Sequence, residues 1–314
     1  MKVLMRGERE HIKIPSGHSF RVLRWERSVE EVECVVAPGC SVVTPGEGAH
    51  WHFHVEMELT LFTSGEGTRF VGDHIGPFAA GDMVLLGENL PHYWHTRSRS
   101  SGISVQWHFP QSHPFWAFPE TLGLGELFDR AKRGLHISGQ TAREVGGLLL
   151  QLARRQGAEQ LATLLHALGR LAAGPDAESL PVSSRSFALA DGPRHQEAIT
   201  HAVRYVIAHF REEIRLESLL KLTGMSRATF SRQFKIHAGR TFSEFLNRLR
   251  LQTACRELEE SERGVLEIAL ASGFTQVSFF NRIFRRQHRC SPTEYRDRQR
   301  KKLRRQREKP GPTK

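Results

Sequence analysis

Two stretches of sequence fifty residues apart, FSRQFKIHAGRTFSEF at residues 230–245 and FNRIFRRQHRCSPTEY at residues 280–295, align over sixteen positions without a gap. In both copies a second Phe follows the first by four residues, and an Arg stands between them. Residues four apart share one face of a helix, so each copy is expected to begin with an amphipathic helix that turns Phe to a core and Arg outward. Thr241 and Ser291 are expected to cap the helix that follows.

A short apolar segment with a glycine turn precedes each copy, LESLLKLTGMS at 216–226 and VLEIALASGFT at 265–275. A helix, a short turn containing Gly and a second amphipathic helix make up a helix-turn-helix unit, and the sequence predicts two of them. Successive major grooves on one face of DNA lie about 34–36 Å apart. A helix from Ser243 onward, at 1.5 Å per residue, supplies about 24 Å of stiff spacer between the two units.

The net charge of +11 is unevenly distributed along the 314 residues. Residues 193–314 hold 27 Lys and Arg against 13 Asp and Glu, a net charge of +14, whereas the preceding residues have a net charge of −3. A basic module joined to a near-neutral one indicates a part that binds a polyanion and a part with another task. Because the repeat lies in the basic part, DNA binding is favoured over a helical dimerisation or solenoid repeat.

General features of the chain predict a cytoplasmic protein. No run of about 18 apolar residues occurs, which argues against a transmembrane helix. The N-terminus becomes charged before an apolar run develops, which argues against a secretory signal. Cys34, Cys40, Cys255 and Cys290 form neither a disulfide framework nor a CxxC metal site.

The pattern of the sequence divides the chain into five parts. Residues 15–110 alternate short apolar runs with Gly, Pro and Asp, which is typical of a small all-β sandwich or barrel. Residues 120–173 carry Leu at helical spacing, and the next twenty lack a period and are rich in Ser, Pro and Gly. We therefore expect a β-barrel at 1–115, a helical region at 116–173 that dimerises or packs on the barrel, a linker at 174–193, a helical DNA-binding domain at 194–298 and a basic tail at 299–314.

The C-terminal third resembles the AraC/XylS family of transcription regulators over residues 199–296. The resemblance rests on SLLKLTGMSRATFSRQFK at 218–235, on NRLRLQTACREL at 247–258, and on a signature that includes IALASGF at 268–274, SFFNRIFRR at 278–286 and SPTEYR at 291–296. Gln276 departs from the family, which often has an acidic residue there. The resemblance implies that the outward positions of the two recognition helices face DNA, namely Ala228, Ser231 and Arg232 in the first and Val277, Ser278, Asn281 and Arg282 in the second.

The chemistry of these side chains suggests different roles. Arg232 and Arg282 suit guanine O6 and N7, and Asn281 suits adenine. Lys235 and Arg285 are better phosphate contacts, which position the protein without reading sequence. Intramolecular ion pairs are the alternative for the two reading arginines, and a solvated tail is the alternative for the basic run at 296–309.

A second motif lies in the β region, where His52, His54 and Glu58 follow H-x-H-x-x-x-E spacing and His92 comes eleven residues after Gly81. Alternate residues of a strand point to one face, so His52 and His54 are expected to project together, with Glu58 and His92 joining them. Three imidazoles and a carboxylate are a usable ligand set for a divalent transition metal. Trp51 is expected on the opposite face, as a packing residue.

This region resembles the cupin superfamily, which implies a jelly-roll barrel. The first motif fits completely, whereas the second departs at Gly87, Asn89 and Thr96. The stretch also resembles the sensory cupin domains of AraC-type regulators, which bind a small effector, often a sugar, and often lack a metal. Three interpretations stay open: a metal held by His52, His54, Glu58 and His92, a metal-free polar pocket that includes these residues and Trp94, or structural histidines.

The sequence predicts a DNA-binding transcriptional regulator, not an enzyme, with an all-β sensor barrel and a C-terminal all-α domain of two helix-turn-helix units. A sugar or related metabolite in the barrel is expected to control it. The expected partners are double-stranded DNA, the effector, a second copy of the chain and RNA polymerase. The alternatives are a metal-dependent cupin dioxygenase or isomerase fused to a DNA-binding domain, and an architectural DNA-binding protein without a ligand.

Overall fold

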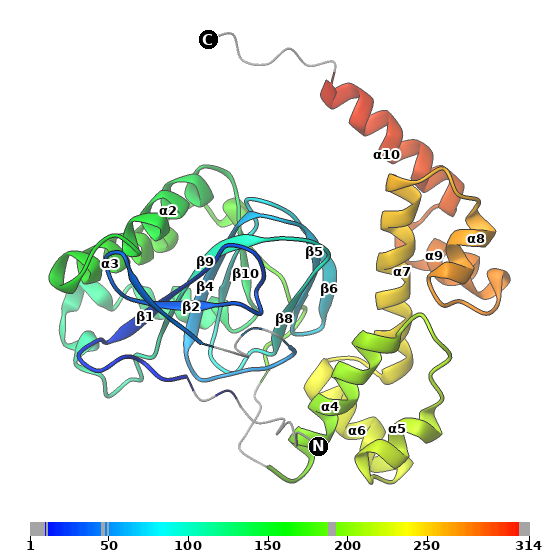
Figure 1. Ribbon diagram of the computed structural model, residues 1–314, viewed down its shortest axis with the longest axis horizontal. Coiled ribbons are helices and arrows are strands. Elements are labelled where there is room, and N and C mark those ends of the chain that lie inside the picture. The colour runs from blue at the N-terminus through cyan, green and yellow to red at the C-terminus, as the bar shows by residue number, and fades with distance from the viewer. Residues whose placement is uncertain (1–9, 11, 45–47, 49, 188–192, 308–314) are drawn as a thin grey trace.

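The computed structural model describes residues 10, 12–44, 48, 50–187 and 193–307. Its N-terminal part, which we call the sensor after the role that the sequence predicts, contains two antiparallel sheets that pack face to face (Figure 1). The larger sheet has the strand order β11-β10-β7-β4-β9-β1-β2-β3 and the smaller has the order β6-β5-β8. The strands are β1 (Phe20–Trp25), β2 (Glu33–Ala37), β3 (Cys40–Val43), β4 (Met57–Ser64), β5 (Gly67–Val71), β6 (His74–Phe78), β7 (Met83–Leu86), β8 (His92–Thr96), β9 (Ser101–Trp107), β10 (Leu135–Ile137) and β11 (Ser179–Pro181).

Strand alternation gives the larger sheet two different faces. On β4, Leu59 and Leu61 pack into a core beneath the sensor helices, whereas Glu58 and Thr60 face the space between the sheets. The same alternation runs through β1 and β9, because successive side chains of a strand point to opposite faces. Three helices cover the outer face: α1 (Leu124–Ala131), α2 (Gly139–Leu152) and α3 (Gly157–Ala173).

The expected division of the sensor is wrong in two places. The helical region 116–173 contains strand β10, and the segment predicted as a linker contributes the short helix η3 (Asp176–Glu178) and strand β11. Both strands extend the larger sheet, since β10 pairs with β7 and with β11. Three-residue strands carry too little period to be recognised in a sequence. Residues 188–192 of the expected linker lie outside the described residues.

The C-terminal part contains the two expected helix-turn-helix units. The first consists of α5 (Leu216–Thr223) and α6 (Arg227–Ala238), the second of α8 (Val265–Ala271) and α9 (Val277–His288), and α7 (Phe242–Glu260) connects them. Helix α4 (Pro193–His209) packs on the first unit, and α10 (Pro292–Arg307) follows the second. The basic run expected as a tail is therefore helical as far as residue 307, and the rest of it lies outside the described residues.

The hydrophobic cores are not divided where the sequence pattern changes. The second unit has a core of its own, formed with the C-terminal half of α7. The first unit instead shares one core with the sensor, whose Trp51, Phe70 and Ile75 pack with residues of α4, α5, α6 and α7. The sensor consequently lies directly against α7 and the first unit (Figure 1). Among the described residues, no helix combines the length and the apolar character that crossing a membrane requires.

Candidate DNA-reading surface and sensor pocket

The two recognition helices, α6 and α9, are anchored by their aromatic residues. Phe230 and Phe234 are buried on α6, and Phe280 and Phe284 are buried on α9, with ring centroids 5.4 Å apart in each pair. Burial of these rings fixes which face of each helix points outward. The core positions predicted from the repeat are confirmed.

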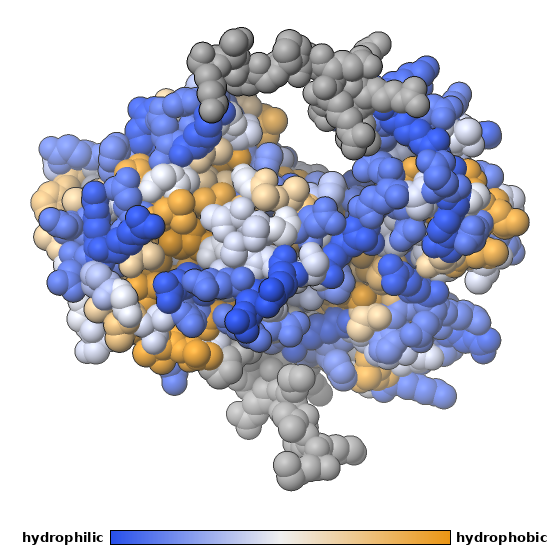
Figure 2. Space-filling model, turned by 45° about the horizontal axis from the view of Figure 1, so that its top comes forward, coloured by the Kyte–Doolittle hydropathy of each residue, from blue (hydrophilic) through white to orange (hydrophobic). Residues whose placement is uncertain are grey.

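The residues expected to contact DNA lie on the outward faces of α6 and α9. Val277 and Asn281 are partly buried, and the others are exposed: Ala228, Ser231, Arg232, Lys235, Ser278, Arg282 and Arg285. Among the described residues, neither Arg232 nor Arg282 pairs with a carboxylate, and the Arg282 guanidinium lies 5.3 Å from the centre of the Phe279 ring. Hydrophilic side chains cover most of the visible face of these C-terminal helices, on the right of Figure 2.

Local capping sets the start of each helix around the recognition helices. The Ser226 hydroxyl accepts a hydrogen bond from the Thr229 amide at the start of α6. Thr241 forms a reciprocal capping box with Glu244, and Ser291 forms the same bonds with Glu294. Both predicted caps are therefore confirmed. Gln276, where the sequence departs from the family, makes no side-chain cap at the start of α9.

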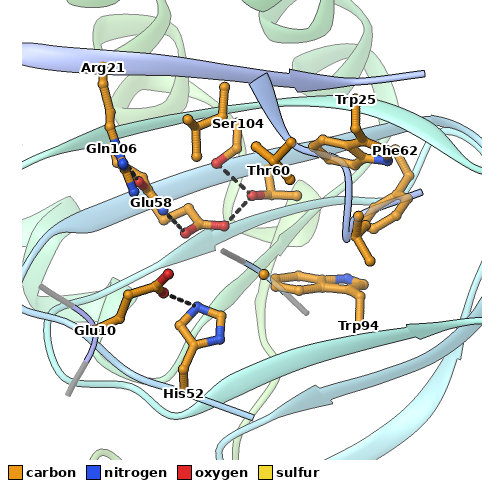
Figure 3. A pocket seen from close by; sticks show the side chains of 14 residues that line it. Glu10, Arg21, Trp25, His52, Glu58, Thr60, Phe62, Trp94, Ser104 and Gln106 are labelled. Atoms are coloured by element: carbon orange, nitrogen blue, oxygen red, sulfur yellow. Dashed lines mark hydrogen bonds and ion pairs between the residues drawn. The ribbon is translucent and has the colours of Figure 1, made fainter. Parts of the chain in front are cut away.

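The sensor contains a cavity of about 490 Å³, including its mouth, between the two sheets (Figure 3). Polar side chains gather at one end of it, and the rings of Trp25, Phe62 and Trp94 lie at the other. Glu58, His52 and Trp94, three of the residues predicted from the motifs, line it. The lining residues that the motifs did not predict include Glu10, Arg21, Trp25, Thr60, Phe62, Ser104 and Gln106.

A hydrogen-bonded network crosses the polar end and holds Glu58 in place. Gln106 donates to Glu58 Oε2 at 2.6 Å, Thr60 donates to Glu58 Oε1 at 2.5 Å, and Arg21 Nε donates to Gln106 at 2.6 Å. These residues come from the adjacent strands β1, β9 and β4, whose registers bring them side by side. Strand alternation could have identified Arg21 and Gln106, whereas nothing in the sequence indicates that Glu10 lies 3.0 Å from His52 Nε2.

His52, His54 and His92 meet behind the cavity, as the motif spacing predicts. One nitrogen of each ring lies within 4.8 Å of the others. The Nδ1 atoms of the three rings lie 2.6 to 2.9 Å from the backbone oxygens of residues 50, 56 and 90. A carbonyl oxygen only accepts, so each Nδ1 carries the hydrogen and each Nε2 is left to bind something else.

The histidines and Glu58 shift one another's pKa values. Burial alone would lower the pKa of His54, but the hydrogen bond and the charge of Glu58, 3.1 Å away, outweigh burial and raise it. Burial would raise the pKa of Glu58, but its hydrogen bond to His54 and the His92 ring, 3.7 Å away, hold that pKa well below its usual value. Burial, with His92 and His54 close by, lowers the pKa of His52 well below 6.5. Below the raised pKa of His54, the cluster contains an ion pair between His54 and Glu58.

Trp51 faces away from the histidine cluster, as expected, and packs between the two parts of the chain. Its ring contacts Phe70 of β5 and Phe245 of α7, with centroids 6.3 and 6.2 Å apart. Trp94 reaches the cavity from β8, beside His92 at 5.6 Å and Phe62 at 5.9 Å. The segment around His52 therefore borders both the cavity and the first helix-turn-helix unit.

Comparison with known proteins identifies a domain family and proteins that are similar to this chain. A helix-turn-helix domain family matches residues 219–298. The transcriptional activator RhaS of Escherichia fergusonii is 25% identical over 251 residues, which cover 78% of this chain and 86% of that protein. These similarities support an AraC/XylS-type regulator. The chain is a DNA-binding transcriptional regulator.

Solved structures similar to the regulator include DNA-binding domains. The DNA-binding domain of the transcriptional factor AdpA, in complex with a target DNA, is 32% identical and matches 33% of this chain and 95% of that one, with a TM-score of 0.32. An AraC family regulator from Rhodopseudomonas palustris is 29% identical, with 32% and 96% coverage and a TM-score of 0.30.

The His54–Glu58 pair predicts a pH effect in the metal-free regulator, kept in chelator. In Glu58→Gln only the weaker effects of the Glu10 and Glu56 charges oppose burial, so we expect the pKa of His54 to fall, measured by NMR titration of the ring. The native pKa is raised, so the stability that protonated His54 contributes is present below pH 6.5 and is lost as the pH rises through the folded pKa. Glu66→Gln, at an exposed carboxylate, serves as the control. A His54 pKa that stays raised in Glu58→Gln would contradict the assignment.

Proposed function

We propose that the regulator reads two successive major grooves with α6 and α9, and that a small molecule bound in the sensor cavity controls this reading. The observation that carries the proposal is the single core shared by the sensor and the first helix-turn-helix unit. A change in the sensor that moves Trp51 acts directly on Phe245 of α7. Phe245 in turn contacts Phe234 of the recognition helix α6, with centroids 5.7 Å apart.

The outward-facing polar residues of the recognition helices divide into two roles. Arg232 and Arg282 donate to guanine and Asn281 pairs with adenine, whereas Lys235 and Arg285 hold phosphates. Ala228, Ser231, Val277 and Ser278 are small enough to let the backbone of each helix approach the base edges. Both arginines are exposed and without a carboxylate partner among the described residues, so their donors are available to DNA.

Single substitutions separate these two roles. Against a duplex selected from a random pool by the full chain, Arg282→Ala should cost about 1–3 kcal/mol and relax selectivity at one base position. Arg285→Ala should weaken binding to all sequences equally, because phosphates carry no sequence information. Selection repeated with each variant measures the difference. Unchanged selectivity in both Arg282→Ala and Arg232→Ala would refute base reading by these helices.

The lining of the cavity suits a compact hydroxylated molecule, such as a sugar or a related metabolite. Its polar end offers donors and acceptors of Thr60, Ser104 and Gln106, and its other end offers the aromatic rings of Trp25 and Trp94. A sugar presents hydroxyl groups at its rim and C–H bonds on its faces, which match these two kinds of lining. A ligand can drive the switch only if it binds the two arrangements of the chain with different affinity.

A divalent transition metal is a second candidate ligand of the sensor, and it makes an enzyme the alternative function. The donor chemistry fits, because three Nε2 atoms converge and that of His92 has no hydrogen-bond partner among the described residues. His52, His54 and His92 would hold the ion, with Glu58 as a further ligand. A bound metal would supply a Lewis acid to a substrate in the cavity. The known relatives are regulators, and we propose that this chain is one without catalytic activity.

Metal and sugar titrations distinguish the two sensor ligands. If the cluster holds a metal, Co²⁺ or Ni²⁺ should bind at one ion per chain and raise the melting temperature of the regulator, and His92→Ala should abolish both effects. His166→Ala, on the exposed face of α3, is the matched control. If the cavity is a metal-free sensor, a panel of monosaccharides should raise the melting temperature in chelator, and Gln106→Ala should remove that response. Turnover of a substrate by the metal-loaded chain would instead establish the enzyme.

We further propose that the regulator is a cytoplasmic homodimer that contacts RNA polymerase when bound to DNA. Leu150 of α2 and Leu161 and Leu165 of α3 are 36 to 47% exposed, and Leu161 and Leu165 lie one turn apart. Exposed Leu residues at helical spacing favour a helix–helix interface.

Charged substitutions test the dimer. The native chain should sediment as a dimer at micromolar concentration, and Leu161→Glu with Leu165→Glu should shift it to monomer. Val43→Glu, at an exposed position of strand β3, should leave the dimer intact. A native chain that sediments only as monomer would contradict the proposal.

A further inference from the structure

Four arginines surround an open hollow between the spacer helix and the second recognition helix. Arg240 lies in the turn before α7 and Arg248 in the first half of that helix, and Arg282 and Arg286 come from α9. We call this the arginine hollow; its volume is about 1300 Å³, including its mouth. Glu244 is the one acidic residue in its lining, and its carboxylate is engaged by the Thr241 cap. The hollow therefore carries a strong net positive charge.

The position of the arginine hollow matches a part of DNA that the recognition helices do not read. When α6 and α9 enter successive major grooves, the backbone between those grooves passes along the helix that joins them. Arg282 belongs both to the hollow and to the outward face of α9, so DNA bound at α9 brings phosphates to the hollow. A guanidinium binds a phosphate through two parallel N–H bonds, which makes arginine the residue best suited to this contact.

The sensor occupies two of the four arginines in this arrangement of the chain. Arg240 Nε donates to the Asp73 carbonyl at 2.7 Å, and its Nη2 lies 3.7 Å from the Asp73 carboxylate. Arg248 Nε donates to the Ile75 carbonyl at 3.3 Å. Nε and Nη2 form one edge of the guanidinium, the edge that a phosphate would take in bidentate fashion. Asp73 and a phosphate cannot both hold that edge of Arg240.

Hydrogen bonds within the sensor fix the position of Asp73, so its contact with Arg240 is not a chance one. It is 6% exposed, and its carboxylate accepts hydrogen bonds from the Ser183 hydroxyl at 2.9 Å and the Ser184 amide at 2.8 Å. The backbones also approach closely, because a Cβ added at Gly239 would lie 2.4 Å from the Cβ of Asp73. The hairpin between β5 and β6 thus packs in direct contact with the turn between α6 and α7.

We propose that Arg240 and Arg248 form a phosphate-binding site for the DNA backbone between the two grooves, and that the Asp73–Ile75 segment of the sensor competes with DNA for it. The docked sensor then lowers DNA affinity by holding these two arginines. Any change that withdraws the segment delivers two additional phosphate contacts. Because phosphate contacts are independent of sequence, this control acts on the strength of binding and leaves the choice of bases unchanged.

The phosphate site is tested with the full chain on a random-sequence duplex of about 30 base pairs, long enough for two successive grooves. Binding of the native chain, Arg240→Gln and Arg248→Gln is measured across salt concentrations. Each substitution should weaken binding and reduce the slope of log K against log salt by about 1. Arg143→Gln, which removes a charge from α2, controls for net charge. Slopes equal to that of Arg143→Gln would overturn the phosphate site.

The competition is tested by a double-variant comparison on the same duplex. Asp73→Ala should tighten binding by about fivefold, a typical coupling between sites, and should do so only when Arg240 is present. In the Arg240→Gln background the same change should have no effect. Asp73→Asn, which keeps the shape of the side chain, replaces Asp73→Ala if circular dichroism shows that the latter is unfolded. Unchanged or weaker binding, or an equal gain in both backgrounds, would overturn the competition.

Discussion

The contact of Trp51 with Phe70 and Phe245 ties the two parts of the regulator together. It places a sensor ring inside the core of the first helix-turn-helix unit, where all three side chains are nearly inaccessible to solvent. Buried aromatic rings contribute more than their area alone, and a packed core has discrete arrangements instead of continuous ones. The first unit therefore cannot change its position relative to the sensor without rebuilding part of its own core.

The segment that contains Trp51 also connects this contact to the cavity. His52 follows Trp51 directly, and strand-like alternation sends the imidazole to the cavity while the indole faces α7. The hydrogen bond between His54 and Glu58 and the network through Gln106 fix the cavity side of this segment. A ligand that rearranges the network acts on a segment one residue from the interface, so no long chain of intermediates is needed to couple the two sites.

Periodicity in the sequence was sufficient to predict the DNA-binding domain but not its relation to the sensor. Each unit must bury one face of its recognition helix, so Phe recurs at helical spacing, at Phe230, Phe234, Phe280 and Phe284. This local requirement is visible in the sequence. The histidine cluster could be predicted as well, because strand alternation and motif spacing act over short distances. Glu10, the pairing of β10 with β7, and the contact of Asp73 with Arg240 depend on residues far apart in the chain, and no local pattern encodes them.

Helix α7 belongs to two cores at once, since Phe245, Leu246 and Leu249 pack with the first unit and Leu251, Ala254 and Leu258 pack with the second. One residue added within it would turn everything beyond by about 100° and shift it by about 1.5 Å. The second recognition helix, α9, would then face away from the major groove that follows the one bound by α6. Insertions and deletions in α7 are consequently far less tolerable than in the loops around it. The rotation of α9 relative to α6 is set by the number of residues in α7, not by the DNA that the protein binds.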